Sequence, residues 1–276
     1  MSGFGPAFLT STSTSFFDLV STLRPEALPT TTGTPVSLPP EGTTVLAFRT
    51  ADGVLMAGDR RATAGHHIAS RRIEKVHRAD ATSVIGIAGT AGLALELIRL
   101  FQVELEHYEK IEGTPLSLEG RANRLAAMLR SNLGLALQGL AVVPLFAGLD
   151  ASGRSGSRGA RDVDTVGRIF SFDVTGGKYE EVDHHAIGSG AGPARSALKR
   201  LWREGLDTGT GVRIALEALT DAADDDAATG GPDIVRGIAP LIRTVGPAGE
   251  RRVPEEEVLA AASALADARM RGEEAP

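Results

Sequence analysis

The composition of the chain changes abruptly between Gly42 and Thr43, and this boundary decides which part can fold. Residues 1–42 hold 24 Ser, Thr, Pro and Gly residues but only four charged ones. Such a segment can bury little apolar surface, so we expect it to be largely disordered. It nevertheless holds four of the nine Phe residues, and part of it could therefore dock on a surface. The folded domain must come from residues 43–276.

The overall composition indicates a globular protein. Of the 276 residues, 42% are hydrophobic, which is enough for a sizeable core. The formal charge is −6 and no basic block is present, which argues against nucleic acid or an anionic membrane as the main partner. The absence of cysteine excludes disulfides, thiolate metal sites and cysteine nucleophiles.

The sequence carries no signal for export or for membrane insertion. No basic residue precedes Arg24, so the N-terminus lacks the positively charged region of an ordinary secretory signal. The uncharged stretch 133–149 contains Gln138 and Pro144 and is shorter than the roughly 20 apolar residues of a membrane span. We therefore expect a soluble, cytoplasmic protein.

Hydrophobic periodicity and turn signals predict pairs of strands and pairs of helices. Asp52-Gly53 is a strong hairpin signal, Thr90 can cap a helix, and Pro254 can open the last one. The expected order is strands at 44–49, 54–59, 72–77 and 83–88, helices after Thr90 and at about 117–138, strands at 141–149, 168–174 and 179–186, helices at about 191–205 and 212–223, a strand at 237–245 and the helix after Pro254.

This order differs from the strand–helix alternation of a parallel fold. It predicts an α+β layered sandwich, in which antiparallel sheets are covered by pairs of helices. We expect residues 150–167, which are rich in Gly, Ser and Arg, to form a long exposed hairpin loop.

Several segments resemble ligand sites but have a simpler explanation. The Gly-rich stretch 188–192 lies between a strand and a helix, but Pro193 breaks the dinucleotide fingerprint. The histidine pairs 66–67 and 184–185 would point to opposite faces of a strand, so neither makes a metal clamp alone. The acidic run 224–226 is explained by an exposed helix end. We expect neither a metal nor an organic cofactor.

The junction between the two parts of the chain offers the clearest chemistry. Cleavage between Gly42 and Thr43 would leave an N-terminal threonine, which combines a nucleophilic hydroxyl with an amine that can act as its base. A free α-amine has a pKa of about 7.7–8.0, which is close to the useful range for a base. While Gly42 is attached, that amine is an amide, so such a protein would be inactive as synthesised.

Lys75 and Asp59 are the candidate partners of such a threonine. Lys75 falls on the third predicted strand, which can run beside the first, and its charge would favour the neutral amine and the ionised hydroxyl. Asp59 ends the second predicted strand and could fix the lysine by an ion pair. From spacing alone, a structural ion pair without catalytic function is the simpler explanation.

Five segments of the domain carry a more specific pattern. They are Thr43-Thr-Val-Leu-Ala-Phe-Arg, Val54-Leu-Met-Ala-Gly-Asp-Arg-Arg-Ala-Thr63, Ile73-Glu-Lys-Val, Ile87-Ala-Gly-Thr-Ala91 and Ala186-Ile-Gly-Ser-Gly. Together they resemble the β subunits of the 20S proteasome, and the similarity covers nearly all of residues 43–272 in order. The segment 222–231, Ala-Ala-Asp-Asp-Asp-Ala-Ala-Thr-Gly-Gly, points to the actinobacterial branch. Residues 1–42 do not match by sequence but lie where this family carries a removable propeptide.

The resemblance implies a threonine endopeptidase of the N-terminal nucleophile class, activated by autocatalytic cleavage between Gly42 and Thr43. Thr43 would be nucleophile and base, with Asp59 and Lys75 as its orienting pair. The backbone N–H of Gly89 would form the oxyanion hole. The amine and its water would be held by three further residues: Ser189, Asp226 and Thr229.

The resemblance also implies how substrate is held. A peptide would lie extended between the backbones of Thr63 and Ala91, as an added strand. The pocket beside the scissile bond would be lined by Ala62, Ile73 and Ala91, which favours apolar side chains.

The implied assembly is larger than one chain. A four-layer αββα sandwich, heptameric β rings stacked between rings of α subunits, and a ring-shaped ATPase that delivers unfolded or tagged proteins are properties of the family that the chain resembles. No metal or organic cofactor is required.

Two rivals stay open. The simpler two-ring peptidase of the same class usually continues its Gly-Asp pattern with Gly-Gln, where this chain has Arg60-Arg61, and residues 43–276 are long for that family. A non-catalytic structural β subunit typically loses the threonine, the lysine or processing, whereas Thr43, Asp59 and Lys75 are all present.

Overall fold

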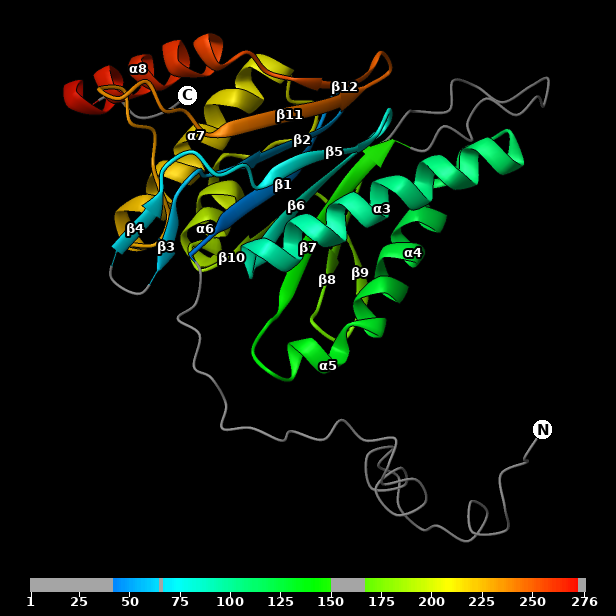
Figure 1. Cartoon of the computed structure of the whole chain (residues 1–276). Coiled ribbons are helices and arrows are strands. Elements are labelled where there is room, and N and C mark those ends of the chain that lie inside the picture. The colour runs from blue at the N-terminus through cyan, green and yellow to red at the C-terminus, as the bar shows by residue number, and fades with distance from the viewer. Residues whose placement is uncertain (1–41, 65–66, 150–166, 273–276) are drawn as a thin grey trace, which may run out of the picture.

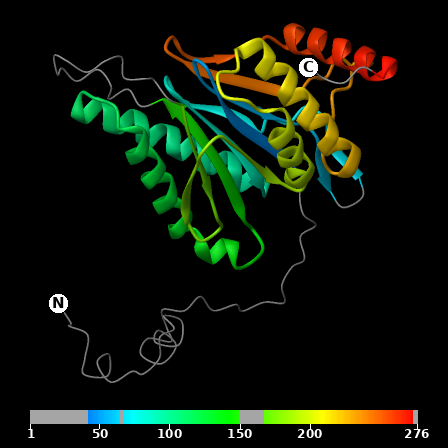
Figure 2. The same ribbon diagram turned by 180° about the vertical axis from the view of Figure 1, so that it is seen from behind.

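The computed structural model describes residues 42–64, 67–149 and 167–272, which form four layers (Figure 1). Two five-stranded antiparallel sheets face each other, and helices cover the outer face of each sheet (Figures 1 and 2). The predicted α+β sandwich of antiparallel sheets is therefore confirmed. The predicted propeptide, 1–42, lies outside the described residues except for Gly42, and so does nearly all of the predicted loop at 150–167.

The first sheet contains the N-terminal hairpin at its centre. Its order is β10–β1–β2–β11–β12, and its strands are β1 (Thr44–Thr50), β2 (Gly53–Gly58), β10 (His184–Gly188), β11 (Leu241–Gly246) and β12 (Gly249–Arg252). Its outer face is covered by α6 (Ala191–Leu201), α7 (Thr208–Asp225) and α8 (Glu255–Arg271).

The second sheet follows the chain order, β5–β6–β7–β8–β9. Its strands are β5 (Val76–Asp80), β6 (Ser83–Gly89), β7 (Val142–Leu149), β8 (Gly167–Phe172) and β9 (Lys178–Glu181). The outer layer on this side is formed by α3 (Ala91–Glu112), α4 (Leu118–Ser131) and the short α5 (Leu133–Ala136). A separate two-stranded hairpin consists of β3 (Ala62–Ala64) and β4 (His67–Ser70).

The side chains of β1 alternate between two hydrophobic cores, so this strand is buried on both faces. Val45 and Ala47 point into the core between the two sheets, whereas Leu46 and Phe48 pack against the helices of the first outer layer. Successive side chains of a strand point to opposite faces, so a continuous apolar run is what a doubly covered strand requires. The four residues are fully buried.

The second hairpin lies further along the chain than predicted. The predicted strand at 72–77 is wrong, because β5 begins at Val76 and the turn falls at residues 81–82. Before β5, the chain leaves the sheet, and the Ile73 N–H donates to the Arg60 carbonyl oxygen. Lys75 therefore precedes β5, and β5 lies in the other sheet from β1, so the expected side-by-side arrangement of these strands is wrong. The Lys75 side chain therefore extends from the segment that leads into the second sheet to the Gly42–Thr43 junction at the start of the first sheet.

Other boundaries also differ from the prediction. The predicted strand at 179–186 is two strands in different sheets, β9 and β10, and the helix at 117–138 is interrupted where the Asn132 side chain donates to the Met128 carbonyl oxygen. The prediction missed β3, β4 and β12. The remaining helices and strands differ by a few residues at their ends: α6 ends at Leu201, α7 spans Thr208–Asp225, and β11 starts at Leu241.

The strand register gathers distant segments at one end of the first sheet. Thr44 pairs with Gly188 of β10, and Val45 pairs with Gly58 of β2. Because both neighbours of β1 run antiparallel to it, the start of β1 meets the ends of β2 and β10. Thr43, Asp59 and Ser189 are therefore brought together by the ladder itself.

Among the helices that the structure describes, none is both long and apolar enough to cross a bilayer.

The aromatic cluster under α3 predicts a large stability loss for Phe146→Ala. Phe146 is fully buried, and its ring centroid lies 5.8 Å from that of Phe101 and 6.3 Å from that of Phe170. We expect the free energy of unfolding to fall by about 3–5 kcal/mol, measured by denaturant titration. The control, Met270→Ala, removes a 79% exposed side chain and should change it by less than about 0.5 kcal/mol. Equal effects of the two substitutions would contradict the packing described for this layer.

Candidate active site

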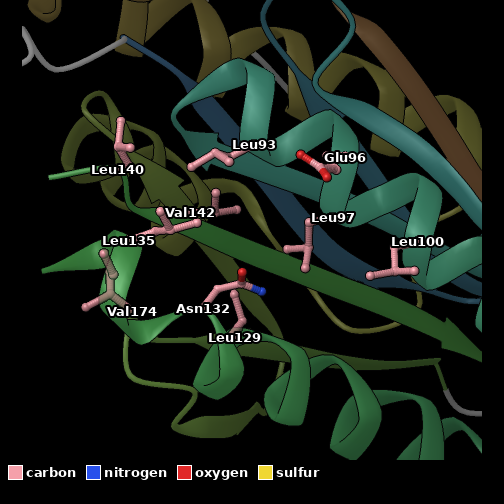
Figure 3. Close-up of a pocket in the computed structure, with 11 residues that line it drawn as sticks. Leu93, Glu96, Leu97, Leu100, Leu129, Asn132, Leu135, Leu140, Val142 and Val174 are labelled. Atoms are coloured by element: carbon pink, nitrogen blue, oxygen red, sulfur yellow. The ribbon is translucent and has the colours of Figure 1, made fainter. Parts of the chain in front are cut away.

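Two pockets differ sharply in their chemistry. The larger one, of about 150 Å³, lies among α3, α4, α5 and β7 (Figure 3). Among the described residues that line it, Glu96 and Asn132 have polar side chains and the rest are apolar, mostly leucines. It offers no nucleophile beside a base, so we place no chemistry there.

The smaller pocket lies at the Gly42–Thr43 junction. It brings together residues from the N-terminal junction, β3, the segment before β5, β5, β6 and the first turns of α3. Seven of the residues expected at the site line it: Gly42, Thr43, Ala62, Ile73, Lys75, Gly89 and Ala91. Glu74, His77, Ile87, Ala94 and Leu95 complete the wall.

Asp59 and Lys75 form a buried ion pair at the floor of the junction. The Lys75 ammonium donates to Asp59 Oδ1 over 2.6 Å, and the two side chains are 5% and 0% exposed. The same carboxylate accepts from three backbone N–H groups, those of Thr44, Arg61 and Gly230, each at 2.9 Å. Four donors on two oxygens fix the carboxylate and, through it, the lysine.

Lys75 also contacts the peptide bond that precedes Thr43. Its ammonium donates to the Gly42 carbonyl oxygen over 3.0 Å. Burial lowers the pKa of Lys75 below its usual range, although the Asp59 carboxylate acts in the opposite direction. A cation beside this carbonyl withdraws electron density from its carbon and makes that carbon more electrophilic.

Ser189 and Asp226 form a polar relay on the nitrogen of Thr43. The Thr43 N–H donates to Ser189 Oγ over 3.3 Å, and the Ser189 hydroxyl donates to Asp226 Oδ2 over 2.5 Å. Burial disfavours the ionised form of Asp226, but hydrogen bonds from Ser189, Thr229 and the Ala228 N–H outweigh it and lower the pKa of this carboxyl group. Asp226 is therefore ionised at neutral pH and keeps the Ser189 hydroxyl oriented.

Thr229 joins this relay at Asp226, and its hydroxyl is hydrogen-bonded to that of Thr44. The fully buried Thr229 hydroxyl donates to Asp226 Oδ2 over 2.6 Å. Its oxygen lies 2.6 Å from the Thr44 hydroxyl, which itself accepts from the Gly190 N–H. Since each hydroxyl has one proton, Thr44 must donate to Thr229, and all these hydroxyls point their protons toward Asp226.

Two glycines allow the backbone to approach closely here. Gly188 has φ +100°, and a Cβ on it would lie 1.8 Å from the Thr43 carbonyl oxygen. Gly89 has φ +109°, and a Cβ on it would lie 2.2 Å from the Ala141 carbonyl oxygen. Both positions exclude a side chain for steric and conformational reasons.

The residues expected to hold substrate are brought to the same place. Ala62, Ile73 and Ala91 line the pocket beside Thr43. Thr63 does not line it, but its hydroxyl oxygen accepts from the Gly42 N–H at 3.3 Å. The residue before the junction is thus held on both sides, by Thr63 at its nitrogen and by Lys75 at its oxygen.

The sequence analysis missed three residues near the junction: Thr44, Glu74 and His77. Thr44 carried a signal, because a second hydroxyl directly follows Thr43. His77 is two residues from Lys75, but it is at the start of β5, whose bounds the prediction misplaced. Burial lowers the pKa of His77, so its imidazole is neutral at neutral pH and adds a polar group to the wall of the pocket.

Comparison with known proteins gives the family of the chain. The proteasome subunit family matches residues 40–236. The proteasome subunit beta of Acidothermus cellulolyticus is 54% identical over 261 residues, which cover 93% of this chain and 88% of the relative. The proteasome subunit beta of Stackebrandtia nassauensis is 52% identical over 262 residues, covering 94% and 91% of the two chains. With this fold and this degree of identity, the chain belongs to the proteasome subunit family and is one of its β subunits.

Proposed function

We propose that this β subunit is catalytic, a threonine endopeptidase that activates itself by cleavage between Gly42 and Thr43. The observation that carries the proposal is the position of Lys75, whose buried ammonium contacts both the Asp59 carboxylate and the Gly42 carbonyl oxygen. A purely structural ion pair would not need to touch the peptide bond in front of a threonine. In this proposal, residues 1–42 are a removable propeptide and residues 43–276 are the peptidase domain.

Activation needs no other protein group as nucleophile. The Thr43 hydroxyl attacks the Gly42 carbonyl carbon and gives up its proton, the carbon–nitrogen bond breaks, and the Thr43 nitrogen leaves with a proton as an amine. The resulting ester between Gly42 and Thr43 Oγ1 is then hydrolysed by water. The products are a carboxylate on Gly42 and a free amine and hydroxyl on Thr43. Lys75 stabilises the charge that develops on the Gly42 oxygen.

The free amine then serves as the base for substrate cleavage. It takes the proton of the Thr43 hydroxyl as Oγ1 attacks a substrate carbonyl carbon, and it returns a proton to the leaving amine. Ser189 and Asp226 hold this nitrogen, while Thr229 orients Asp226. The N–H of Gly89 binds the developing oxyanion, as one donor of this kind contributes about 2.7–4 kcal/mol in comparable enzymes. Water hydrolyses the acyl-enzyme ester and restores Thr43.

The substrate is an extended peptide of an unfolded protein. It lies between the backbones of Thr63 and Ala91, with one side chain in the pocket lined by Ala62, Ile73 and Ala91. Activity that waits for cleavage at Gly42 suits a protease with broad specificity, because it delays hydrolysis until the subunit has assembled.

The family assigns other proteasome subunits as partners. We propose the family arrangement, seven-subunit β rings stacked between α rings, with a ring-shaped ATPase that supplies unfolded or tagged proteins in the cytoplasm. A non-catalytic structural β subunit is the alternative. It would keep the fold and the ion pair but would not be processed at Thr43.

The first test is processing of the chain in assembled particles. Co-expressed with a proteasome α subunit, the wild-type chain should lose 42 of its 276 residues, roughly 4.4 kDa of 28.7 kDa, and begin at Thr43. Thr43→Ala should stay full length because it lacks the hydroxyl, and the matched control Thr43→Ser, which keeps it, should be processed. Intact mass and N-terminal sequencing give the answer. A wild-type chain that stays full length in assembled rings would leave only the structural alternative.

The second test compares the catalytic rates of two variants, one at Asp226 and one at the neighbouring Asp225. Asp226→Asn removes the charge that orients Ser189 and Thr229, so kcat on a peptide substrate should fall on the order of 100-fold, with KM nearly unchanged. Asp225→Asn is the control, because Asp225 is exposed at the end of α7. Rates are divided by the fraction of chains that begin at Thr43. Equal rates for the two variants would show that the relay has no part in catalysis.

A further inference from the structure

A second polar hollow lies directly behind the Asp59 carboxylate. Three arginines line it, Arg60, Arg61 and Arg71, together with Gly230 and Gly231 of the loop after α7 and with Asp233. It shares no residue with the pocket at Thr43. Ile238 completes the lining, which holds three cationic side chains and one anionic one, whereas the chain as a whole carries a net charge of −6.

Arg60 is buried without all of its donors being used. It is only 9% exposed, its guanidinium donates to Glu255 over 2.9 Å and to the Arg72 carbonyl oxygen over 3.3 Å, and its Nε has no hydrogen-bond partner. Buried donors of a charged group are nearly always paired, because an unpaired one forfeits its hydration. Arg60 thus adds positive charge to the wall of the hollow, and its Nε is a buried donor that no described residue satisfies.

The other two arginines leave positive charge at the hollow. Arg61 lies against Gly230, where a Cβ would come within 2.8 Å of Arg61 Cβ, and its guanidinium donates only to the Ala227 carbonyl oxygen, over 2.8 Å. Arg71 is exposed and forms no hydrogen bond or ion pair with any residue in the described ranges. In the part of the chain that the structure describes, neither guanidinium forms a salt bridge, although, besides the hydrogen bond from Arg236, the charge of Arg71 contributes to the lowered pKa of Asp233.

The acidic groups nearby are already engaged. Asp233 pairs with Arg236 over 2.7 Å, and Glu255 pairs with Arg60 over 2.9 Å. Because both carboxylates already have a salt-bridge partner, the guanidinium donors of Arg71 are available to a ligand, even though Arg71 also acts on Asp233 through its charge.

We propose that this hollow is a binding site for a small oxyanion, a carboxylate or a phosphate. The guanidinium fork matches both groups in shape and charge. The volume, about 30 Å³, exceeds the 10–15 Å³ that one water molecule needs, which suits a single anionic group and excludes a nucleotide. The anion comes either from solution or from an acidic side chain of a neighbouring subunit.

The hollow is connected to the candidate active site through Asp59. The N–H groups of Arg61 and Gly230, two wall residues, both donate to Asp59 Oδ2, while Oδ1 holds Lys75. Besides burial, the charge of Arg61 contributes to the lowered pKa of Lys75. A bound anion offsets that charge, so occupancy of the hollow should change the rate of processing or hydrolysis. This consequence rests on the proposed function, whereas binding itself does not.

The test measures binding to the full chain carrying Thr43→Ala, so that processing cannot alter the sample. Inorganic phosphate, followed by ³¹P NMR line broadening, and acetate, followed by the rise in Tm, are titrated with NaCl added to keep the ionic strength constant. Binding should saturate, and Arg71→Gln should weaken it at least about tenfold. The control is Arg99→Gln, which removes the same charge from an exposed position on α3 and should leave binding unchanged.

The outcomes separate the sources of the anion. Saturable binding of phosphate alone supports an anion from solution, and binding of acetate as well supports a carboxylate, including that of a neighbouring subunit. No saturable binding of either probe, or equal binding by the Arg71→Gln and Arg99→Gln variants, overturns the proposal. Because processing at Thr43 is not part of this measurement, its failure would refute the proposed function without affecting the result here.

Discussion

The buried ion pair between Asp59 and Lys75 is the interaction on which the rest of the site depends. Burying two charges costs several kcal/mol per ion, and removing one partner from such a pair typically destabilises a protein by about 3–5 kcal/mol. The cost is offset here because the carboxylate accepts four hydrogen bonds, from Lys75 and from three backbone N–H groups. The pair thus links the start of β1, the end of β2, the segment before β5 and the loop after α7.

The ion pair can form only because the two sheets approach closely. Lys75 precedes β5 of one sheet, and Asp59 follows β2 of the other. A Cβ on Gly58 would lie 2.9 Å from Val76 Cγ2, and a Cβ on Gly86 would lie 2.4 Å from Val45 Cγ1. Glycine at these facing positions lets the valines of the opposite sheet fill the space. Small residues in the central core therefore set the distance over which the lysine reaches its aspartate.

The sequence predicted the parts of this arrangement that depend on local pattern. Asp52-Gly53 fixed the first hairpin, and the register of that hairpin brings Asp59 back to the start of β1. The contact between Thr44 and Thr229 could not be predicted, because 185 residues separate the two and the contact depends on where α7 ends. The strand predicted at 72–77 begins later for a related reason: Ile73 bonds to Arg60 outside either sheet, a contact that the local pattern does not reveal.

The two oxygens of Asp59 face two different environments, so the position of Lys75 depends on both of them. Oδ1 holds Lys75 toward the junction at Thr43, and Oδ2 is held by N–H groups from the wall of the arginine-lined hollow. Because a carboxylate is a rigid plane, a shift of Arg61 or Gly230 that turns this group also moves the oxygen that holds Lys75. Any group that binds in the hollow must therefore act on the same carboxylate that positions the lysine. The proposed anion site and the junction at Thr43 are thus linked through one side chain, that of Asp59.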